Sequence, residues 1–268
     1  PHKEAMQTVA AFLERGKKVV DLSADFRLRD QAVYEKWYQT HSNPELIPEA
    51  AYGLPELYRE QIKSARLVAN PGCYPTATVL AAAPLIKTGK AELTHIIADA
   101  KSGASGAGRK GDLALSFAEV NEGVKAYGVF SHRHTPEIAQ ELSALAGTPV
   151  SVTFTPHLIP MQRGILSTVY LQLKNPMSTE ELRALYNDFY KGEPFVRVLP
   201  GTDVPRTQDV AGSNYCDVAP VAGPDGRVIC LGAIDNLIKG ASGAAVQNMN
   251  LVLGLPETTG LKGVAVVP

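Results

Sequence analysis

Apolar residues along the first part of the chain alternate between helical spacing and short continuous runs, a pattern that predicts an α/β fold. Residues 5–13 have the spacing of an amphipathic helix, and residues 18–23 have the pattern of a buried strand. Helical spacing returns at residues 33–40 and 56–64, and residues 66–69 form a second apolar run of strand length. We therefore expect the chain to open in the middle of a helix–strand alternation, as in a parallel sheet.

The second half of the chain is richer in strand patterns. Strands are predicted at residues 95–100, 150–154, 165–174, 195–199 and 227–232. Ser178 predicts the start of a helix over residues 179–190, and the small residues over 241–253 predict a helix suited to close packing. We interpret this half as a mixed α+β layer.

The composition is that of a globular protein able to bury a large core, with 268 residues, 45% of them hydrophobic and 20% charged. The formal net charge of −1 provides no basic surface for nucleic acid, and no apolar run reaches the length of a membrane span. Three widely separated cysteines (Cys73, Cys216 and Cys230) form no metal-ligand spacing, and their odd number fits a reducing compartment. We therefore expect a cytoplasmic protein without a metal.

Residues 70–76, Asn-Pro-Gly-Cys-Tyr-Pro-Thr, place one cysteine on a tight turn before a helical stretch. The apolar run from Thr76 onward predicts a buried helix, so Cys73 faces unpaired N–H groups and the positive end of the helix dipole. Both features favour the thiolate, and we expect a lowered pKa for the Cys73 thiol. Cys73 is thus a candidate nucleophile, whereas Cys216 and Cys230 are interpreted as inert core thiols.

Two further segments carry polar chemistry. Residues 101–110, Lys-Ser-Gly-Ala-Ser-Gly-Ala-Gly-Arg-Lys, follow a predicted strand and suit either a phosphate or carboxylate ligand or a flexible surface loop. Residues 131–138 put His132, His134 and Glu137 at the start of an expected helix. General acid–base chemistry is favoured there over metal binding, because further ligands are absent from the sequence nearby. The spacing leaves open which imidazole meets the sulfur, since alternate residues of an extended stretch point the same way.

Four segments together resemble those of a known enzyme family. They are residues 70–76, 102–110, the His-Arg-His-Thr-Pro-Glu run at 132–137, and the Asp-Asn-Leu-Ile-Lys-Gly run at 235–240. In order and spacing they look like the segments of N-acetyl-gamma-glutamyl-phosphate reductases, within the broader aspartate-semialdehyde dehydrogenase-like group. The similarity runs over essentially the whole chain, and the cysteine turn with the His-Arg-His segment is its most specific part.

The resemblance implies the third step of arginine biosynthesis. In that step NADPH reduces N-acetyl-gamma-glutamyl phosphate to N-acetyl-L-glutamate 5-semialdehyde, and phosphate is released. By this analogy Cys73 attacks the acyl phosphate and forms a thioester. His134 is our choice of acid–base group, with Glu137 as its orienter.

The resemblance also implies ligand-binding residues. Arg109, Lys110 and His132 are expected to hold the phosphate or the carboxylates of the substrate. The nicotinamide half of the NADP cofactor is expected to contact four residues, namely Ser102, Gly103, Ser105 and Asn236. Asn236 is assigned to the carboxamide of the nicotinamide.

One departure from the family concerns the start of the chain. The Gly-rich dinucleotide fingerprint of the first βα turn does not precede residue 1, which corresponds to on the order of 70–80 missing residues. If the protein begins at residue 1, we expect the fragment to bind NADPH weakly and to turn over little, which a fluorescence titration with NADPH would measure.

The expected architecture is a partial Rossmann domain with an insertion. We assign residues 1–72 and 236–268 to the partial NADP-binding Rossmann domain, and residues 73–235 to an inserted α+β domain for catalysis and oligomerisation. By analogy with relatives, we expect a homodimer or homotetramer.

Three alternatives to the reductase remain open. A related semialdehyde dehydrogenase of lysine synthesis would reduce a carrier-bound aminoadipyl phosphate. A cofactor-free acyltransferase or hydrolase would use Cys73 and His134 without NADP. A catalytically inactive assembly module would leave Cys73 with ordinary alkylation kinetics.

Overall fold

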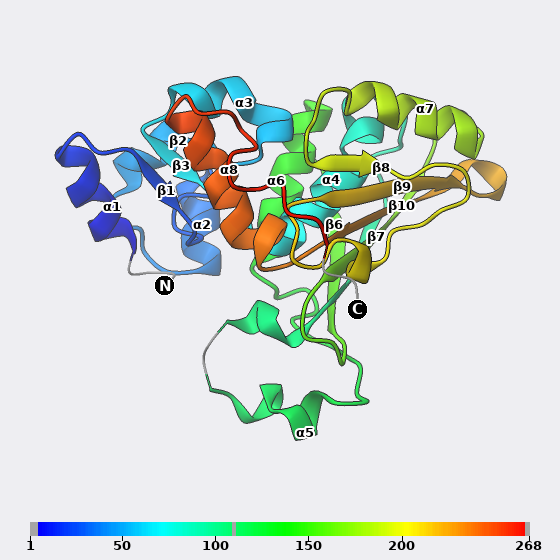
Figure 1. Ribbon diagram of the computed structural model, residues 1–268, viewed down its shortest axis with the longest axis horizontal. Helices are drawn as coiled ribbons and strands as arrows, with labels where there is room; N and C mark the ends of the chain where they lie inside the picture. The colour runs from blue at the N-terminus through cyan, green and yellow to red at the C-terminus, as the bar shows by residue number, and fades with distance from the viewer. Residues whose placement is uncertain (1–4, 109–110, 266–268) are drawn as a thin grey trace.

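The computed structural model describes residues 5–108 and 111–265, which form two β-sheets flanked by helices (Figure 1). The strands are β1 (Val19–Asp21), β2 (Ala50–Tyr52), β3 (Leu67–Ala69), β4 (Ile96–Ser102), β5 (Lys125–Ala126), β6 (Val152–Leu158), β7 (Ile165–Gln172), β8 (Val196–Val198), β9 (Cys216–Ala222) and β10 (Arg227–Ile234). The α-helices are α1 (Ala5–Glu14), α2 (Gln31–Trp37), α3 (Pro55–Ser64), α4 (Cys73–Lys87), α5 (Phe117–Val120), α6 (His134–Ala146), α7 (Thr179–Phe189) and α8 (Gly243–Val252). Among the described residues, no helix combines the length and hydrophobicity that crossing a membrane requires.

The smaller sheet is parallel, with the strand order β1-β3-β2, and its central strand is covered on both faces. Leu67 and Ala69 of β3 pack with Tyr34 of α2 on one face. Val68 packs with Leu251 of α8 on the other face, because successive strand residues point to opposite sides. The last helix of the chain therefore returns to the first sheet (Figure 1), and the partial Rossmann fold predicted from the sequence is confirmed.

The larger sheet is mixed, with the strand order β5-β6-β4-β7-β10-β9-β8, and within the described residues helices pack on one of its faces. α4, α6 and α7 pack on that face, where α4 is buried at every position from Tyr74 to Ile86. On the opposite face Ile97, Tyr170 and Ile229 are paired across β4, β7 and β10 and are exposed by 41%, 40% and 37%. Among the described residues, this face therefore carries an apolar row that no helix covers.

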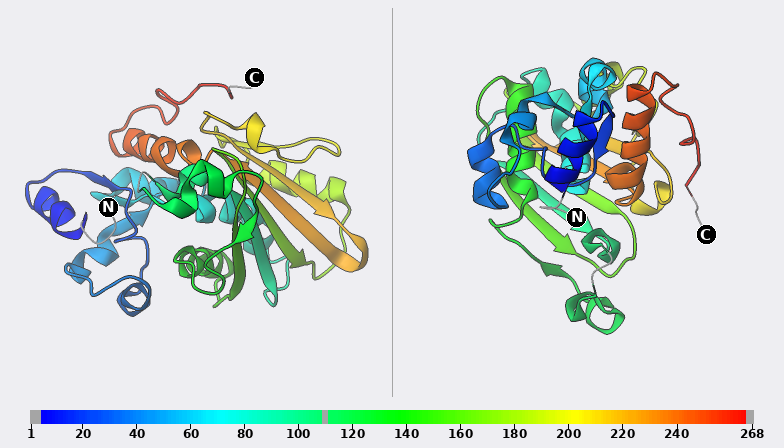
Figure 2. Two further views of the ribbon diagram at one scale, coloured as in Figure 1. Left: turned by 90° about the horizontal axis from the view of Figure 1, so that it is seen from below. Right: turned by 90° about the vertical axis from the view of Figure 1, so that its left-hand side faces the viewer.

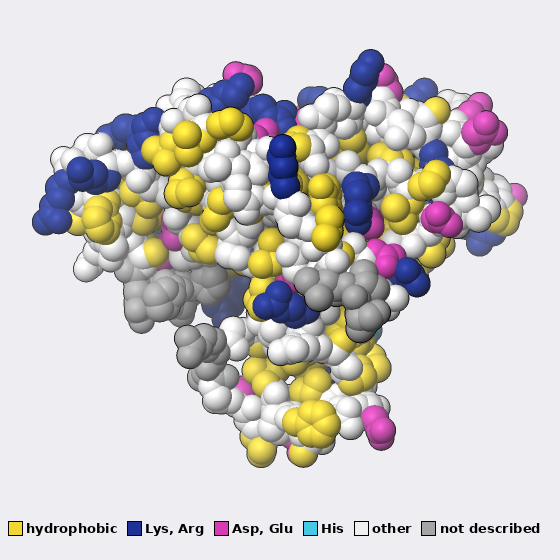
Figure 3. Space-filling view, in the orientation of Figure 1, with side chains coloured by type: hydrophobic (Ala, Val, Ile, Leu, Met, Phe, Trp, Pro, Cys, Tyr) yellow, Lys and Arg dark blue, Asp and Glu magenta, His cyan; other side chains and the backbone are white. Residues whose placement is uncertain are grey.

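A long excursion between β4 and α6 projects from the body of the molecule and contains α5 (Figures 1 and 2). It exposes large apolar side chains, with Leu113 and Phe117 around α5 exposed by 77% and 82%, and Phe130 after β5 exposed by 75%. Figure 3 shows apolar side chains gathered on this part of the surface. The base of the excursion returns to the sheet through the short strand β5, which pairs with β6.

Three strands, β2, β5 and β9, were missed in the sequence, and α4 and α6 begin two or three residues earlier than expected. Prolines at positions 44, 48 and 55 favour a surface loop, yet β2 lies between them and pairs with β3. β9 carries Pro220, which is tolerated because β8 pairs only with residues 216–218 and leaves the rest of β9 at the sheet edge. α4 begins at Cys73 rather than near Thr76, and α6 begins at His134, so both reactive side chains belong to the first turn of a helix.

Candidate active site

The cysteine turn lies at the carboxyl end of β3, the central strand of the smaller sheet. The chain leaves β3, turns through residues 70–72 and enters α4 at Cys73. The N–H of Asn70 donates to the carbonyl of Asp21 over 2.8 Å, and its side-chain oxygen accepts a 3.0 Å bond from Asn248 of α8. Ligands bind at this edge of open α/β sheets, so the thiol lies where a substrate and a cofactor can meet.

The buried carboxylate of Glu137 holds this turn in place. Its Oε1 accepts hydrogen bonds from the N–H of Gly72 at 2.8 Å and from the hydroxyl of Tyr52 at 2.9 Å. Its Oε2 lies 3.5 Å from Nη1 of Arg27, and Nε of Arg27 donates to the carbonyl of Asn70 over 2.7 Å. Burial raises the pKa of Glu137, while Arg27 and the Gly72 N–H act in the opposite direction.

These contacts extend the role that the sequence suggested for Glu137. The sequence interpretation made it the orienter of His134, and that pairing stays a prediction. The structure adds a direct hydrogen bond from the backbone N–H of Gly72, next to Cys73, to Glu137. Arg27 and Tyr52 also bind in this cluster, and sequence reasoning missed both because they come from segments without a recognisable motif.

The imidazole of His134 lies directly against the cysteine turn. A Cβ built on Gly72 would be only 2.5 Å from Nε2 of His134, so the ring fills the space where a side chain would stand. Gly72 has φ of −69°, a value open to any residue, so the requirement for glycine is spatial. Of the two candidate imidazoles, this places His134 in contact with the residue before Cys73.

His132 lies behind His134 in a box of aromatic rings. Its ring centroid is 5.6 Å from Tyr74, 5.5 Å from Tyr127 and 5.4 Å from Phe154. Burial, with a smaller contribution from the neighbouring arginine, lowers the pKa of His132 to about 4. Its Nδ1 accepts a 3.1 Å hydrogen bond from the backbone N–H of His134, which leaves the proton on Nε2. His132 is therefore a neutral hydrogen-bond donor at physiological pH.

The expected lowering of the Cys73 pKa was wrong. Cys73 is partly exposed, yet burial raises the pKa of its thiol from the ordinary 9.0 to about 11. The N–H of Tyr74 and the charge of Arg27 act in the opposite direction, as expected at a helix start, but they do not compensate for the lost solvation. The net rise corresponds to about 3 kcal/mol against the thiolate. The free thiol is therefore protonated at neutral pH and needs a base.

The small-residue loop after β4 forms the other side of the site. Nδ2 of Asn236 donates to Oγ of Ser105 at 3.0 Å, and its Oδ1 accepts from the N–H of Gly164 at 2.7 Å. Gly103 is required for space, because a Cβ there would lie 2.7 Å from the carbonyl of Gln162. These contacts bring the predicted cofactor residues of the loop together with Asn236.

A pocket of about 330 Å³ connects this loop with His132 and the base of the excursion. Its walls include Ser102, Gly103 and Gly106 on one side, and His132 and Tyr127 on the other. Predicted cofactor and substrate residues thus share one cavity. Tyr127, which the sequence did not single out, belongs to the same wall.

Two of the predicted substrate residues, Arg109 and Lys110, lie outside the described residues.

Within the described part of the chain, no group of three or more His, Cys, Asp or Glu residues is arranged to hold a metal ion. Cys216 and Cys230 are fully buried, and Cys230 accepts a hydrogen bond from Tyr186 at 3.2 Å, which fits inert core thiols.

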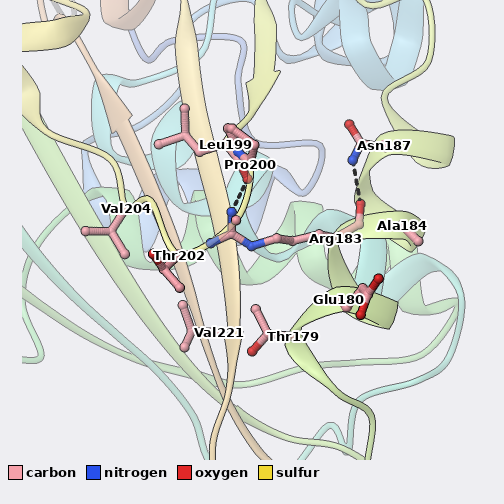
Figure 4. Close-up of a pocket in the computed structure, with 11 residues that line it drawn as sticks. Thr179, Glu180, Arg183, Ala184, Asn187, Leu199, Pro200, Thr202, Val204 and Val221 are labelled. Carbon is pink, nitrogen blue, oxygen red and sulfur yellow. Dashed lines mark hydrogen bonds between the residues drawn. The ribbon is translucent and has the colours of Figure 1, made fainter.

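A larger pocket of about 710 Å³ lies between α7 and the loop after β8 (Figure 4), and it contains none of the residues predicted to act. Arg183 reaches across it and donates to the carbonyls of Leu199 and Asp203. The guanidinium therefore fastens this loop to α7.

Comparison with known proteins gives consistent matches over the chain. Two family models match: the semialdehyde dehydrogenase NAD-binding domain over residues 1–65 and the semialdehyde dehydrogenase dimerisation domain over residues 73–236. The N-acetyl-gamma-glutamyl-phosphate reductase of Geobacter metallireducens is 59% identical over 270 residues, which cover 100% of this chain and 78% of the relative. The protein of that name from Symbiobacterium thermophilum is 59% identical over 264 residues, 97% of this chain and 76% of the relative.

Solved structures show the same fold at lower identity. Aspartate semialdehyde dehydrogenase II of Vibrio cholerae, complexed with ASA, matches with a TM-score of 0.70 and 17% identity over 94% of this chain and 76% of that chain. The aspartate semialdehyde dehydrogenase of Francisella tularensis matches with a TM-score of 0.67 and 14% identity over 94% of this chain and 80% of that chain.

The raised thiol pKa predicts how Cys73 reacts in the ligand-free protein. Its rate of alkylation by iodoacetamide should rise about tenfold for each pH unit between roughly pH 7 and pH 9, because the thiolate is the reacting form. Mass spectrometry of the alkylated peptide measures the rate at each pH, and a Cys73→Ala variant measures the background. A rate that is already constant near pH 7 would contradict the raised pKa.

The contact between His134 and Gly72 predicts the effect of a single methyl group. Gly72→Ala should lower the free energy of unfolding by about 1–3 kcal/mol, because the ring and the turn must separate. Urea denaturation measures the change. Gly263→Ala is the matched control, since no atom lies within 4 Å of a Cβ there, and its effect should stay within about 0.5 kcal/mol. Equal free energies of unfolding for the two variants would show that the turn accommodates a methyl group at position 72 without loss of stability.

Proposed function

The chain belongs to the semialdehyde dehydrogenase family, among its N-acetyl-gamma-glutamyl-phosphate reductases, and we propose that Cys73 carries the acyl group through the reaction as a thioester. The reaction reduces N-acetyl-gamma-glutamyl phosphate to N-acetyl-L-glutamate 5-semialdehyde with release of phosphate, a step of arginine biosynthesis. The observation that carries the proposal is the contact of the His134 ring with the residue before Cys73.

The first chemical step is the attack of Cys73 on the acyl phosphate. Because burial keeps the free thiol protonated, its proton has to leave as the carbon–sulfur bond forms. Nε2 of His134, the ring nitrogen against the turn, is the acceptor. The sulfur bonds to the acyl carbon, the bond from that carbon to the phosphate oxygen breaks, and phosphate departs with the electron pair. The product of this step is the Cys73 thioester and a protonated His134.

A bound nicotinamide cofactor supplies the hydride that reduces the thioester carbon. The pocket beside His132 fits a flat ring, because Ser102, Gly103 and Gly106 leave one wall nearly free of side chains. Asn236 has one amide hydrogen engaged by Ser105, so its second amide hydrogen can donate to the carboxamide oxygen. NADP is the form implied by the family resemblance, and comparing the KM for NADPH with that for NADH tests this choice.

His134 also completes the second half of the reaction. It returns its proton to the oxygen on the reduced carbon, which gives a hemithioacetal on Cys73. Collapse of the hemithioacetal breaks the carbon–sulfur bond while its hydroxyl proton passes through His134 to the sulfur, which releases the aldehyde and restores the Cys73 thiol. One imidazole therefore moves the same proton in both directions.

The substrate anions require donors that surround Cys73. His132 is suited to hydrogen bonding rather than to charge pairing, because its imidazole is neutral and its Nε2 carries the proton. Arg109 and Lys110 follow the small-residue loop in sequence, and we assign to them the positive charge that the phosphate or carboxylates need.

The uncovered face of the larger sheet suits a second copy of the chain. Ile97, Tyr170 and Ile229 form an apolar row on that face, within the region that matches a dimerisation domain. Burying such a row against its own symmetry copy would give an isologous interface and a homodimer, from which a homotetramer can be assembled.

The three cysteines are all unpaired, which supports a cytoplasmic location.

Replacing the nucleophile should abolish the reaction. Cys73→Ala and Cys73→Ser should lose phosphate-dependent reduction of NADP⁺ by N-acetylglutamate semialdehyde by more than about 10³-fold. The rate is followed by the absorbance of NADPH. Cys216→Ala is the matched control, because that thiol is buried in the core and should be dispensable for catalysis.

Assays in the forward direction, with the acyl phosphates as substrates, separate the alternative functions. A reductase of lysine synthesis would prefer a carrier-bound aminoadipyl phosphate over N-acetyl-gamma-glutamyl phosphate. An acyltransferase would release phosphate repeatedly without NADPH. Retention of full activity by Cys73→Ala would exclude the thioester.

Placing a charge in the apolar row should break the dimer. Tyr170→Asp should shift the protein toward monomer, because an unpaired carboxylate in an interface core is costly to bury. Analytical ultracentrifugation measures the change. Phe12→Asp, an exposed position of α1 away from this sheet, is the control and should leave the assembly unchanged. A Tyr170→Asp protein that assembles like the parent would place the interface elsewhere.

A further inference from the structure

A fully buried ion pair joins Lys239 to Glu56. Nζ of Lys239 lies 2.6 Å from Oε1 of Glu56 and donates to Oε1 of Gln247 at 2.8 Å. Both charged side chains are 0% exposed, which is true of no other ion pair among the described residues. An arrangement of this kind is costly to desolvate, so its retention calls for an explanation in terms of what it holds in place.

The residue after Lys239 lies against the nucleophile. Gly240 belongs to a single π-helical turn, Ile238–Ser242, in which its N–H donates to the carbonyl of Asp235 at 2.9 Å. A Cβ built on Gly240 would be 2.8 Å from Cβ of Cys73. The π turn is therefore the wall behind Cys73, and isolated π turns of this kind are frequent at functional sites.

The next residue of the π turn holds the cysteine turn itself. The carbonyl of Ala241 accepts a 3.2 Å hydrogen bond from Nδ2 of Asn70, three residues before Cys73. Three consecutive residues thus each make one of these contacts. Lys239 forms the buried ion pair, Gly240 lies against Cβ of Cys73, and Ala241 accepts a hydrogen bond from the turn that carries Cys73.

The partners of Lys239 come from the part of the chain that flanks the smaller sheet. Glu56 lies in the first turn of α3, within the region that matches a NAD-binding domain, and Gln247 lies on α8. The ion pair therefore connects the cofactor-binding part of the chain to the wall behind Cys73.

We propose that Lys239 is a positioning residue, whose ion pair with Glu56 fixes the Cys73 thioester relative to the cofactor-binding part of the chain. This inference rests on the proposed thioester role of Cys73. It assigns to Lys239 the hydride-transfer step and not the formation of the thioester, because Glu137 and His134 contact Gly72 of the cysteine turn, whereas the hydrogen bonds of Lys239 go to Glu56 and Gln247.

The test separates the two chemical steps in a variant that keeps no unpaired buried charge. Lys239→Met combined with Glu56→Leu removes both charges and keeps similar volumes, because removing only one partner would leave a buried charge uncompensated. Rapid-quench measurement of the phosphate burst without cofactor reports thioester formation. Stopped-flow absorbance of NADPH reports the hydride step.

We expect the rate of the phosphate burst to stay within about threefold of the parent. The rate of the hydride step should fall by at least about tenfold, because small displacements of reacting groups cause losses of that size. The matched control is Arg197→Met combined with Asp217→Asn. That ion pair joins β8 to β9, and the hydrogen bonds of Arg197 go to Asp217 and Asp209 instead of to Lys239, Glu56 or Gln247. Both steps should stay within about threefold of the parent in the control, even if its melting temperature falls.

A milder variant keeps the test decisive if the double variant fails to fold. Gln247→Leu keeps the Lys239–Glu56 ion pair and removes the second acceptor of the Lys239 ammonium, together with the hydrogen bonds of Gln247 to Asn214 and Glu257. It should slow the hydride step selectively, by about fivefold. An unchanged hydride step in the folded variants, or an equal loss in both steps, would overturn the positioning role. Absence of any phosphate burst in the parent would instead overturn the thioester itself.

Discussion

The arrangement of this active site depends on one buried carboxylate, that of Glu137. It binds the backbone N–H of Gly72, the hydroxyl of Tyr52 and, at longer range, the guanidinium of Arg27. These donors come from three segments that are far apart in sequence, and a buried carboxylate is tolerated only when such donors surround it. Because Arg27 also binds the carbonyl of Asn70, both ends of the cysteine turn are held by the same cluster.

The burial that keeps the cysteine turn rigid also determines the protonation states of the reactive side chains. It keeps Cys73 as a thiol and His132 as a neutral imidazole, so the resting site has few free charges next to the sulfur. Attack then depends on proton transfer to His134 as the substrate reacts, and not on a stored thiolate. A helix start stabilises an anion by about 0.3–1 kcal/mol, which is less than the penalty of removing the sulfur from water.

The two sheets contribute different parts of the site, and the chain passes from the smaller to the larger sheet once and returns with α8. The smaller sheet delivers Cys73 at the end of β3, and the larger sheet delivers Ser102 at the end of β4. α6 brings His134 and Glu137, and α8 returns to contact Asn70 through Asn248. The site therefore exists only when both layers are assembled, which explains why its residues are spread over most of the chain.

The sequence alone determined the features that depend on neighbouring residues. Periodicity located β1, β3, α1 and α7, the last with the full capping box at Ser178, and the cysteine turn with the His-Arg-His run identified the reactive segments. Tertiary structure decided the rest. β2 forms because β3 pairs with it between the prolines, and β9 forms because β10 pairs with it along its length while β8 leaves the edge at Pro220 unpaired. Gly72 is required because His134 occupies its side-chain space. The pKa of Cys73 rises because atoms distant in sequence exclude water from it. Spacing along the chain encodes local hydrogen bonding and amphipathicity, whereas desolvation and close contact depend on which remote segments come to lie around a residue.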